Sequence, residues 1–227
     1  MSLAIFQNVS RLYPTGKGVQ DLSFSLDFHQ SIGLLGLNGS GKTTTLKLLA
    51  GLMLPDRGQI QIAGQKPRKA RQEISFLSDK DSFDMWMKPK DVCAFMQAFY
   101  PDFRTEVFPQ LCDRLQVPTQ SLNSMSKGQQ QRLRLAACFS RKASLYLLDE
   151  PLSGIDVISR EMILRILAEH RQIGSTMVIS THEIKEIEVL LDRVLILRDG
   201  NLVLDQLKPT SQRREDSFTQ KFIDLHL

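Results

Sequence analysis

The chain has 227 residues, of which 42% are hydrophobic and 24% charged, and its formal net charge is +4. This composition is ordinary for a globular protein. The sequence contains no apolar run near the roughly 20 residues of a membrane span, and its N-terminus lacks the basic region and long apolar core of a signal peptide, so any membrane association is expected to go through a partner.

The first third of the chain predicts short strands around one helix. Alternating or continuous apolar residues predict five strands, at Leu3–Val9, Leu22–Phe28, Ser31–Leu35, Gln59–Ala63 and Ile74–Leu77. A helix is expected over Lys42–Ala50, because Gly51 and Pro55 follow it as stop signals.

The densest basic run is Lys66–Arg71, which precedes the last of these strands. Its charges could contact phosphates or an anionic membrane surface. No aromatic residues interleave them, as stacking on nucleic acid would favour. We interpret the run as a solvated loop and expect no nucleic-acid partner.

Residues 89–122 differ in character, because aromatic and other apolar residues recur there at helical spacing. The residues concerned are Val92, Phe95, Met96 and Phe99, and then Val107, Leu111 and Leu115. Pro101 and Pro118 frame the second group. The pattern predicts a small helical insertion whose apolar residues serve packing rather than cofactor binding.

The three cysteines, Cys93, Cys112 and Cys138, form no CxxC pair. This spacing argues against a disulfide scaffold or a zinc site. Cys138 lies in an apolar run and is expected to be a small buried hydrophobe.

The rest of the chain predicts helices alternating with strands. A helix is expected after Ser126, then a strand at Leu145–Leu148, a helix with one apolar face, a strand at Met177–Ser180, a charged helix beginning near Glu183 and a strand at Val194–Leu197. The apolar face comprises Ile158, Met162, Ile163, Ile166 and Leu167. Asp199 and Gly200 predict a hairpin turn into Leu202–Leu204. Such alternation predicts a mainly parallel sheet with helices on its faces.

The segment Gly36–Thr43 matches the phosphate-binding pattern GxxxxGK[ST] between an apolar strand and a helix. Glycines let the backbone amides surround a phosphate, and the helix N-terminus adds its positive end. Lys42 is expected to reach the β- and γ-phosphates, and the Thr43 hydroxyl to bind Mg²⁺. The predicted ATP contacts in this segment are Gly36, Leu37, Asn38, Gly39, Ser40, Gly41, Lys42, Thr43 and Thr44.

Two acids follow the apolar strand Leu145–Leu148, at the end where parallel sheets place their ligands. Asp149 is expected to hold Mg²⁺, and Glu150 to polarise the attacking water. Two adjacent acids could instead cap a helix, but the accompanying phosphate loop favours the functional interpretation.

The segment Met125–Arg132, MSKGQQQR, resembles the signature of ABC-type ATPases, LSGGQ followed by a QR pair. Its form with Lys127 resembles that of many export-type and related bacterial ABC subunits. The resemblance covers roughly the first 205 residues. It implies an α/β P-loop NTPase fold with a mainly parallel central sheet, an antiparallel β subdomain and a small helical subdomain at about residues 80–140. The whole chain, residues 1–227, would form one ABC ATPase domain with a C-terminal tail at about 209–227.

Further site residues are implied by the same resemblance. Tyr13 matches the aromatic residue that stacks on adenine, Asp156 the D-loop of the dimer interface, and His182 the switch histidine at the γ-phosphate. Asp79 takes the position of the Q-loop glutamine that touches Mg²⁺, with Asp81 close behind, so the chain departs from the family pattern there. We expect Asp79 to act as a magnesium ligand through water.

The resemblance implies ATP and Mg²⁺ as cofactors and a head-to-tail dimer of ATPase subunits, either a homodimer or a heterodimer. Each ATP would lie between Lys42 and Thr43 of one subunit and the signature residues Ser126, Lys127, Gly128 and Gln129 of the other. A separate transmembrane permease subunit would couple the cycle to transport, which places this chain in the cytoplasm, peripheral on the cytoplasmic face of the membrane.

A soluble ABC ATPase in a cytosolic assembly system, without a membrane partner, is the alternative. DNA-repair and chromosome members need a long coiled coil or a zinc insertion, and translation members need two cassettes. The sequence shows neither.

Overall fold

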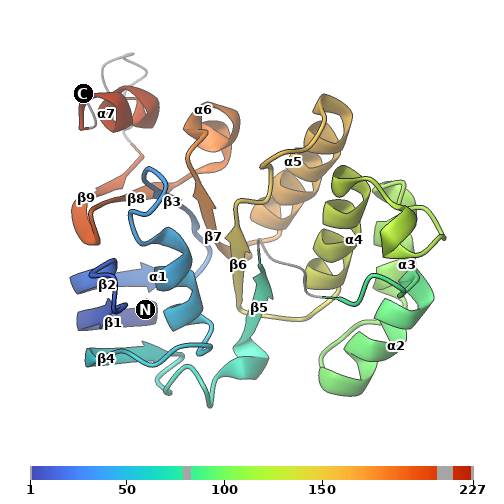
Figure 1. The fold of residues 1–227 in the computed structure, drawn as a ribbon, viewed down its shortest axis with the longest axis horizontal. Coiled ribbons are helices and arrows are strands. Elements are labelled where there is room, and N and C mark those ends of the chain that lie inside the picture. The colour runs from blue at the N-terminus through green and yellow to red at the C-terminus, as the bar shows by residue number, and fades with distance from the viewer. Residues whose placement is uncertain (1, 79–82, 209–216, 226–227) are drawn as a thin grey trace.

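The computed structural model describes residues 2–78, 83–208 and 217–225, and shows an α/β fold built on two sheets (Figure 1). The strands are β1 (Ser2–Leu12), β2 (Gly18–Asp27), β3 (Ser31–Leu35), β4 (Arg57–Ile62), β5 (Ile74–Leu77), β6 (Leu145–Asp149), β7 (Thr176–Thr181), β8 (Arg193–Arg198) and β9 (Asn201–Leu207). The α-helices are α1 (Lys42–Leu49), α2 (Pro89–Phe99), α3 (Val107–Arg114), α4 (Lys127–Phe139), α5 (Val157–Gln172), α6 (Ile184–Ile187) and α7 (Phe218–Asp224). Short 3₁₀ helices occur at η1 (Arg71–Glu73), η2 (Leu122–Ser124) and η3 (Glu188–Leu190).

The larger sheet has the strand order β5-β6-β7-β3-β8-β9 and is parallel except for β9. The antiparallel β8–β9 hairpin turns at Asp199 and Gly200, whose φ values of 49° and 80° are those of a type I′ turn. The predictions of a mainly parallel sheet and of a hairpin turn at Asp199 and Gly200 are both confirmed.

Alternate residues of the central strands enter two different cores. Leu145 and Leu147 of β6 join the core that contains α1 and the small sheet. Tyr146 and Leu148 join the core that contains α4 and α5. Because both faces of β6 are covered, its sequence is a continuous apolar run rather than an alternation of apolar and polar residues.

The smaller, antiparallel sheet has the order β2-β1-β4. Phe6 and Phe24 face each other across β1 and β2, with stacked rings 4.5 Å apart. Helix α1 packs between this sheet and the larger one (Figure 1). The beginning of α1 is thereby fixed at the C-terminal edge of the parallel strands.

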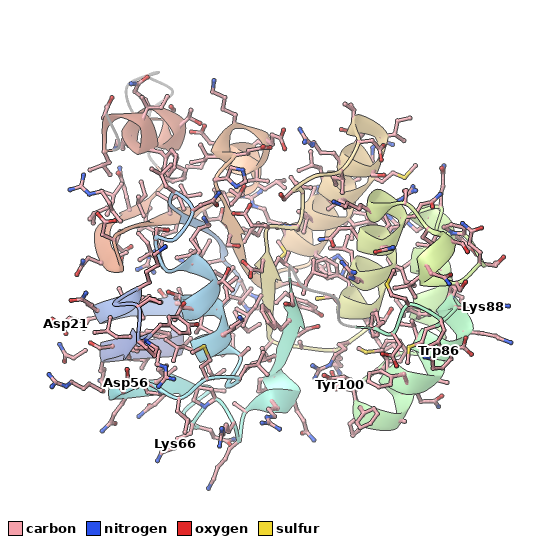
Figure 2. The ribbon with its side chains drawn as sticks, viewed as in Figure 1. Asp21, Asp56, Lys66, Trp86, Lys88 and Tyr100 are labelled. Carbon is pink, nitrogen blue, oxygen red and sulfur yellow. The ribbon has the colours of Figure 1, made fainter. Side chains whose placement is uncertain are left out.

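Helices α2, α3 and α4 gather beyond the β5 edge of the larger sheet (Figure 1). We call residues 83–139 the helical region. Trp86 and Lys88 lie at its outer side, far from Asp21 on β2 and from Asp56, which directly precedes β4 (Figure 2). The assignment of the whole chain to one domain, with this region as a subdomain, stays a prediction.

Arg141 joins the helical region to the sheet. Its guanidinium group donates to both carboxylate oxygens of Asp102 at 3.0 Å and to the carbonyl oxygen of Ile74 at the start of β5. The same group lies 4.1 Å from the ring centre of Tyr100. Since Arg141 is only 4% exposed, its charge depends on these partners.

Three details of the sequence prediction are corrected by the structure. Ile158 was placed on the buried face of its helix but is 68% exposed, because it is the second residue of α5 and the buried apolar residues of this helix begin only at Ile163. Phe99 was assigned to packing but is 67% exposed at the last position of α2. The charged helix near Glu183 is only the single turn of α6, followed by η3.

The expectations for the basic run and for Cys138 are confirmed. Lys66, Arg68, Lys69 and Arg71 are exposed, as a solvated loop requires. Cys138 is 5% exposed, and burial raises the pKa of its thiol to about 11. No helix in the described part of the chain combines the length and apolarity of a membrane span.

Candidate active site

The candidate site lies where β3, β6 and β7 end, at the C-terminal edge of the larger sheet. The loop after β3 returns on itself to start α1, and its geometry requires glycine. Gly36 has φ 156°, and a Cβ atom there would lie 2.5 Å from the carbonyl oxygen of Leu197. Gly41, at the N-cap of α1, has φ 106° and would meet the side chain of Val19 at 2.6 Å. The two glycines allow the backbone to curl tightly ahead of the helix N-terminus.

Lys42 crosses this loop from the first position of α1. Its Nζ atom donates to the carbonyl oxygen of Gly36 at 2.7 Å and lies 3.3 Å from Oε1 of Glu150. The side chain is only 6% exposed. Nζ also donates to the carbonyl oxygen of Leu37 at 3.4 Å, so the buried ammonium group is balanced by one carboxylate and two carbonyl groups.

Asp149 and Glu150 end β6 beside Ser180 of β7. The carboxylate of Asp149 is fully buried and accepts hydrogen bonds from Thr43 Oγ1 at 3.2 Å and from Ser180 Oγ at 2.7 Å. The backbone N–H of Glu150 donates to Ser180 Oγ at 2.9 Å. Ser180 thus holds both acids in place.

Glu150 also contacts His182, which follows β7. The Nδ1 atom of His182 lies 3.1 Å from each carboxylate oxygen of Glu150. Glu150 has φ 46°, in the left-handed region that a side chain disfavours. This backbone conformation directs its carboxylate to a position between Lys42 and His182.

The signature residues form a second cluster, at the start of α4. Ser126 is the N-cap: its hydroxyl oxygen accepts from the backbone N–H of Gln129 at 3.2 Å, and Gln129 Oε1 accepts from the backbone N–H of Ser126 at 2.8 Å. This capping box starts the helix at Lys127.

Asp156 lies beside this cluster and caps α5. A Cβ atom on Gly128 would be 2.9 Å from Asp156 Oδ2 and 2.8 Å from Ser159 Oγ, so a larger residue there would have to displace these two side chains. Hydrogen bonds from the hydroxyl and the backbone N–H of Ser159 lower the pKa of the Asp156 carboxyl. Asp156 therefore stays ionised next to the signature helix.

Among the described residues, Tyr13 stands apart from these clusters. Tyr13, between β1 and β2, is half-buried and donates its hydroxyl to the sulfur atom of Met53 at 3.4 Å. Asp79 and Asp81 lie outside the described residues, so the magnesium role expected of Asp79 stays a prediction.

Ser180 was not among the predicted site residues. Its signal was its position in the segment STHE, but its link to the acids depends on the pairing of β6 with β7, in which Asp149 is opposite Ser180. The mutual contacts of Lys42, Glu150 and His182 were likewise not predicted.

Comparison with known proteins identifies the family. The family model described as ABC transporter matches residues 19–153, which contain the phosphate loop, the signature and both acids. The chain belongs to the ABC transporter family. It is an ATP-binding subunit of this family and an ATPase.

Curated relatives agree with the assignment. The chain is 31% identical to the SkfA peptide export ATP-binding protein SkfE of Bacillus subtilis, over 95% of this chain and 94% of that protein. It is also 31% identical to the Nod factor export ATP-binding protein I of Burkholderia orbicola, over 88% of this chain and 69% of that protein.

Solved structures share the fold of this ABC ATPase. One, described as the ATP-binding subunit of an ABC transporter, has a TM-score of 0.85 at 23% identity and covers all of both chains. Another, an ATP-binding cassette solved as a dimer with ADP and Pi, has a TM-score of 0.81 at 20% identity, covering 92% of this chain and all of that one.

Proposed function

We propose that this chain hydrolyses ATP at the cluster of Lys42, Thr43, Asp149, Glu150 and His182, and that the cycle powers export through a separate membrane subunit. The observation that carries the site assignment is the placement of Glu150 between Lys42 and His182 (3.3 and 3.1 Å). Lys42 exchanges Glu150 for the β- and γ-phosphate oxygens of ATP. The released carboxylate of Glu150 accepts a hydrogen bond from the attacking water, and His182 holds this carboxylate in position.

The phosphate loop fits a polyphosphate. Ser40 is 5% exposed, and within the described residues its hydroxyl has no hydrogen-bond partner. A buried hydroxyl is costly without a partner, and a phosphate oxygen supplies one. The remaining loop residues contribute backbone N–H groups, and Tyr13 stacks on the adenine.

Magnesium fits the pair Thr43 and Asp149, whose oxygen atoms lie 3.2 Å apart. Mg²⁺ is held in nucleotide sites by few protein oxygens together with phosphates and waters. When bound, the ion would neutralise charge on the phosphates, while Ser180 holds the Asp149 carboxylate in place.

We propose that two ATPase subunits pack head to tail. Ser126 uses its hydroxyl oxygen as the N-cap acceptor, which leaves its proton for the γ-phosphate of the opposing subunit. The α4 N-terminus adds the positive end of the helix dipole. Val157 and Ile158, 79% and 68% exposed, follow Asp156 and favour burial of this surface against another subunit.

The membrane subunit docks on the helical region in this proposal. A groove of about 100 Å³ lies between β5, α2 and α4, lined by Phe83, Phe95, Met96, Tyr100 and Arg134 among others. The exposed ring of Phe99 extends this aromatic surface, 4.7 Å from that of Phe95. A space of this size fits one side chain of a short permease helix that lies against the aromatic surface, and docking there places the chain on the cytoplasmic face of the membrane.

The hydrolysis step is tested with purified protein. Glu150→Gln should retain ATP binding, lose turnover and accumulate as a dimer with ATP and Mg²⁺ in size-exclusion chromatography with light scattering. Glu161→Gln, an exposed acid on α5, is the matched control. Normal turnover by the Glu150 variant would refute the assignment, whereas an inactive monomer would indicate that a different ATPase subunit is the natural partner.

The docking step separates the transporter from the soluble alternative. Phe99→Ser should abolish stimulation of ATPase activity by the reconstituted membrane subunit while leaving the basal rate unchanged. Leu207→Ser, at a similarly exposed position on β9, should leave the stimulation by the membrane subunit intact. If Phe99→Ser leaves the stimulation unchanged, the helical region is not the docking surface.

A further inference from the structure

The C-terminal helix α7 packs beside α6, the single turn that follows His182 (Figure 1). Phe218 at the start of α7 is 1% exposed and belongs to the same buried core as Ile184 and Ile187 of α6. Helix α7 therefore packs against α6, the segment that directly follows His182, rather than lying free on the surface.

Glu188 makes the polar part of this contact. It begins η3, directly after α6, and its Oε1 accepts from the backbone N–H of Phe218 at 2.7 Å. Its Oε2 accepts from the hydroxyl of Thr219. A half-buried carboxylate with two donors at a helix N-terminus is a directional link, stronger than an exposed ion pair.

The far side of α7 is fixed to the sheet. Arg198 at the end of β8 donates to the carbonyl oxygen of Leu225 at 2.8 Å, and Lys221 donates to Gln206 of β9 at 2.9 Å. On the opposite side of α6, Arg160 of α5 pairs with Glu186 and lies 3.9 Å from Glu183. The segment after His182 is thus supported by α7 through Glu188 and by α5 through Arg160.

We infer that α7 sets the position of His182 through Glu188, which makes Glu188 a positioning residue for hydrolysis. The inference rests on the proposed role of His182. Only five residues separate His182 from η3, so a shift of η3 moves the imidazole relative to Glu150. Lys42 and Tyr13 do not touch α6 or α7 in the contacts of the described residues, so ATP affinity should not depend on this support.

The test measures kcat and KM for ATP in full-length variants. Glu188→Ala should lower kcat about tenfold with KM unchanged, because two charge-assisted hydrogen bonds are lost. Thr219→Val, which removes one donor without changing shape, should lower kcat by less. Glu188→Gln should restore part of the loss. Asp224→Ala is the control, since Asp224 accepts only from Gln220 within α7 in the contacts of the described residues.

A double variant separates positioning from general destabilisation. In a His182→Ala background, Glu188→Ala should lower kcat no further, because the two residues act through one group. An equal further loss in that background, or an unchanged kcat for both Glu188→Ala and Thr219→Val, overturns the inference. A wild-type kcat for His182→Ala would instead remove the proposed role of His182, and this inference with it.

Discussion

The ammonium group of Lys42 lies 3.3 Å from the carboxylate of Glu150, although Lys42 begins α1 and Glu150 follows β6, far along the chain. The pair joins the group proposed to bind phosphate to the group proposed to activate water. Arrival of a polyphosphate would separate them. The carboxylate then becomes available for catalysis only when the substrate is in place.

Lys42→Ala should therefore reduce kcat at least about a hundredfold, because the γ-phosphate loses its main charge partner. Lys47→Ala, the same substitution in the last turn of α1, should leave turnover within about twofold of the wild type. Steady-state ATPase assays, with circular dichroism to verify folding, make the comparison. Substantial turnover by a well-folded Lys42→Ala protein would contradict the assignment of the phosphate loop.

Asp102→Ala should destabilise the protein by about 3 kcal/mol, since it leaves the buried guanidinium of Arg141 without its carboxylate. Glu169→Ala removes the partner of Arg114, an exposed pair, and should cost less than about 1 kcal/mol. Urea denaturation of both variants gives the two free energies of unfolding. Equal losses would mean that Arg141 does not depend on Asp102.

Asp156→Ala should lower the melting temperature, because α5 loses the N-cap acceptor for Ser159. Asp156→Asn keeps an acceptor oxygen and should retain most of the stability. If Asp156 also lies at the proposed dimer interface, both variants should weaken ATP-dependent dimerisation of a Glu150→Gln protein. Dimerisation unchanged in both would limit Asp156 to its capping role.

His170 predicts a specific dependence of stability on pH. Its ring lies 3.9 Å from that of Phe139, and burial lowers its pKa below the ordinary value of 6.5. The folded state therefore favours neutral His170, so its contribution to stability is present above pH 6.5 and is lost as the pH falls towards the lowered pKa.

His170→Phe removes this titration. The free energy of unfolding should decline less steeply between pH 7.5 and about 5.5 in the variant than in the wild type. Urea titrations across that range compare the two slopes, which do not depend on any constant packing cost of the substitution. Parallel slopes would show that other groups dominate acid destabilisation.

Much of the fold was predictable because its signals are local. Ser31–Leu35 and Ile74–Leu77 were predicted with the bounds that the structure shows, since both are short apolar runs between turn-forming residues. Gly36–Thr43 was predicted because the phosphate-loop pattern itself specifies the turn. Ile158 was misplaced because helical spacing does not reveal where the core ends.

The contacts within the site depend on strand pairing and were harder to predict from the sequence. Ser180 supports Asp149 only because β6 and β7 pair in parallel with these residues opposite each other. No local pattern specifies that register. The contact between α7 and Glu188 was not predicted either, since Phe218 and Glu188 are 30 positions apart and no local pattern links them.

The missing side chain of Gly128 has a consequence for a dimer. The start of α4 packs directly on Asp156 and Ser159, so we expect the signature residues and Asp156 of one subunit to move together as one unit. In the proposed head-to-tail arrangement, this unit faces the nucleotide of the neighbouring subunit. Closure around one ATP would then preorganise the second site, and hydrolysis should rise cooperatively with ATP concentration, with a Hill coefficient above one. Gly128→Ala would displace the side chains of Asp156 and Ser159 and weaken this contact, so the dependence on ATP should become less cooperative.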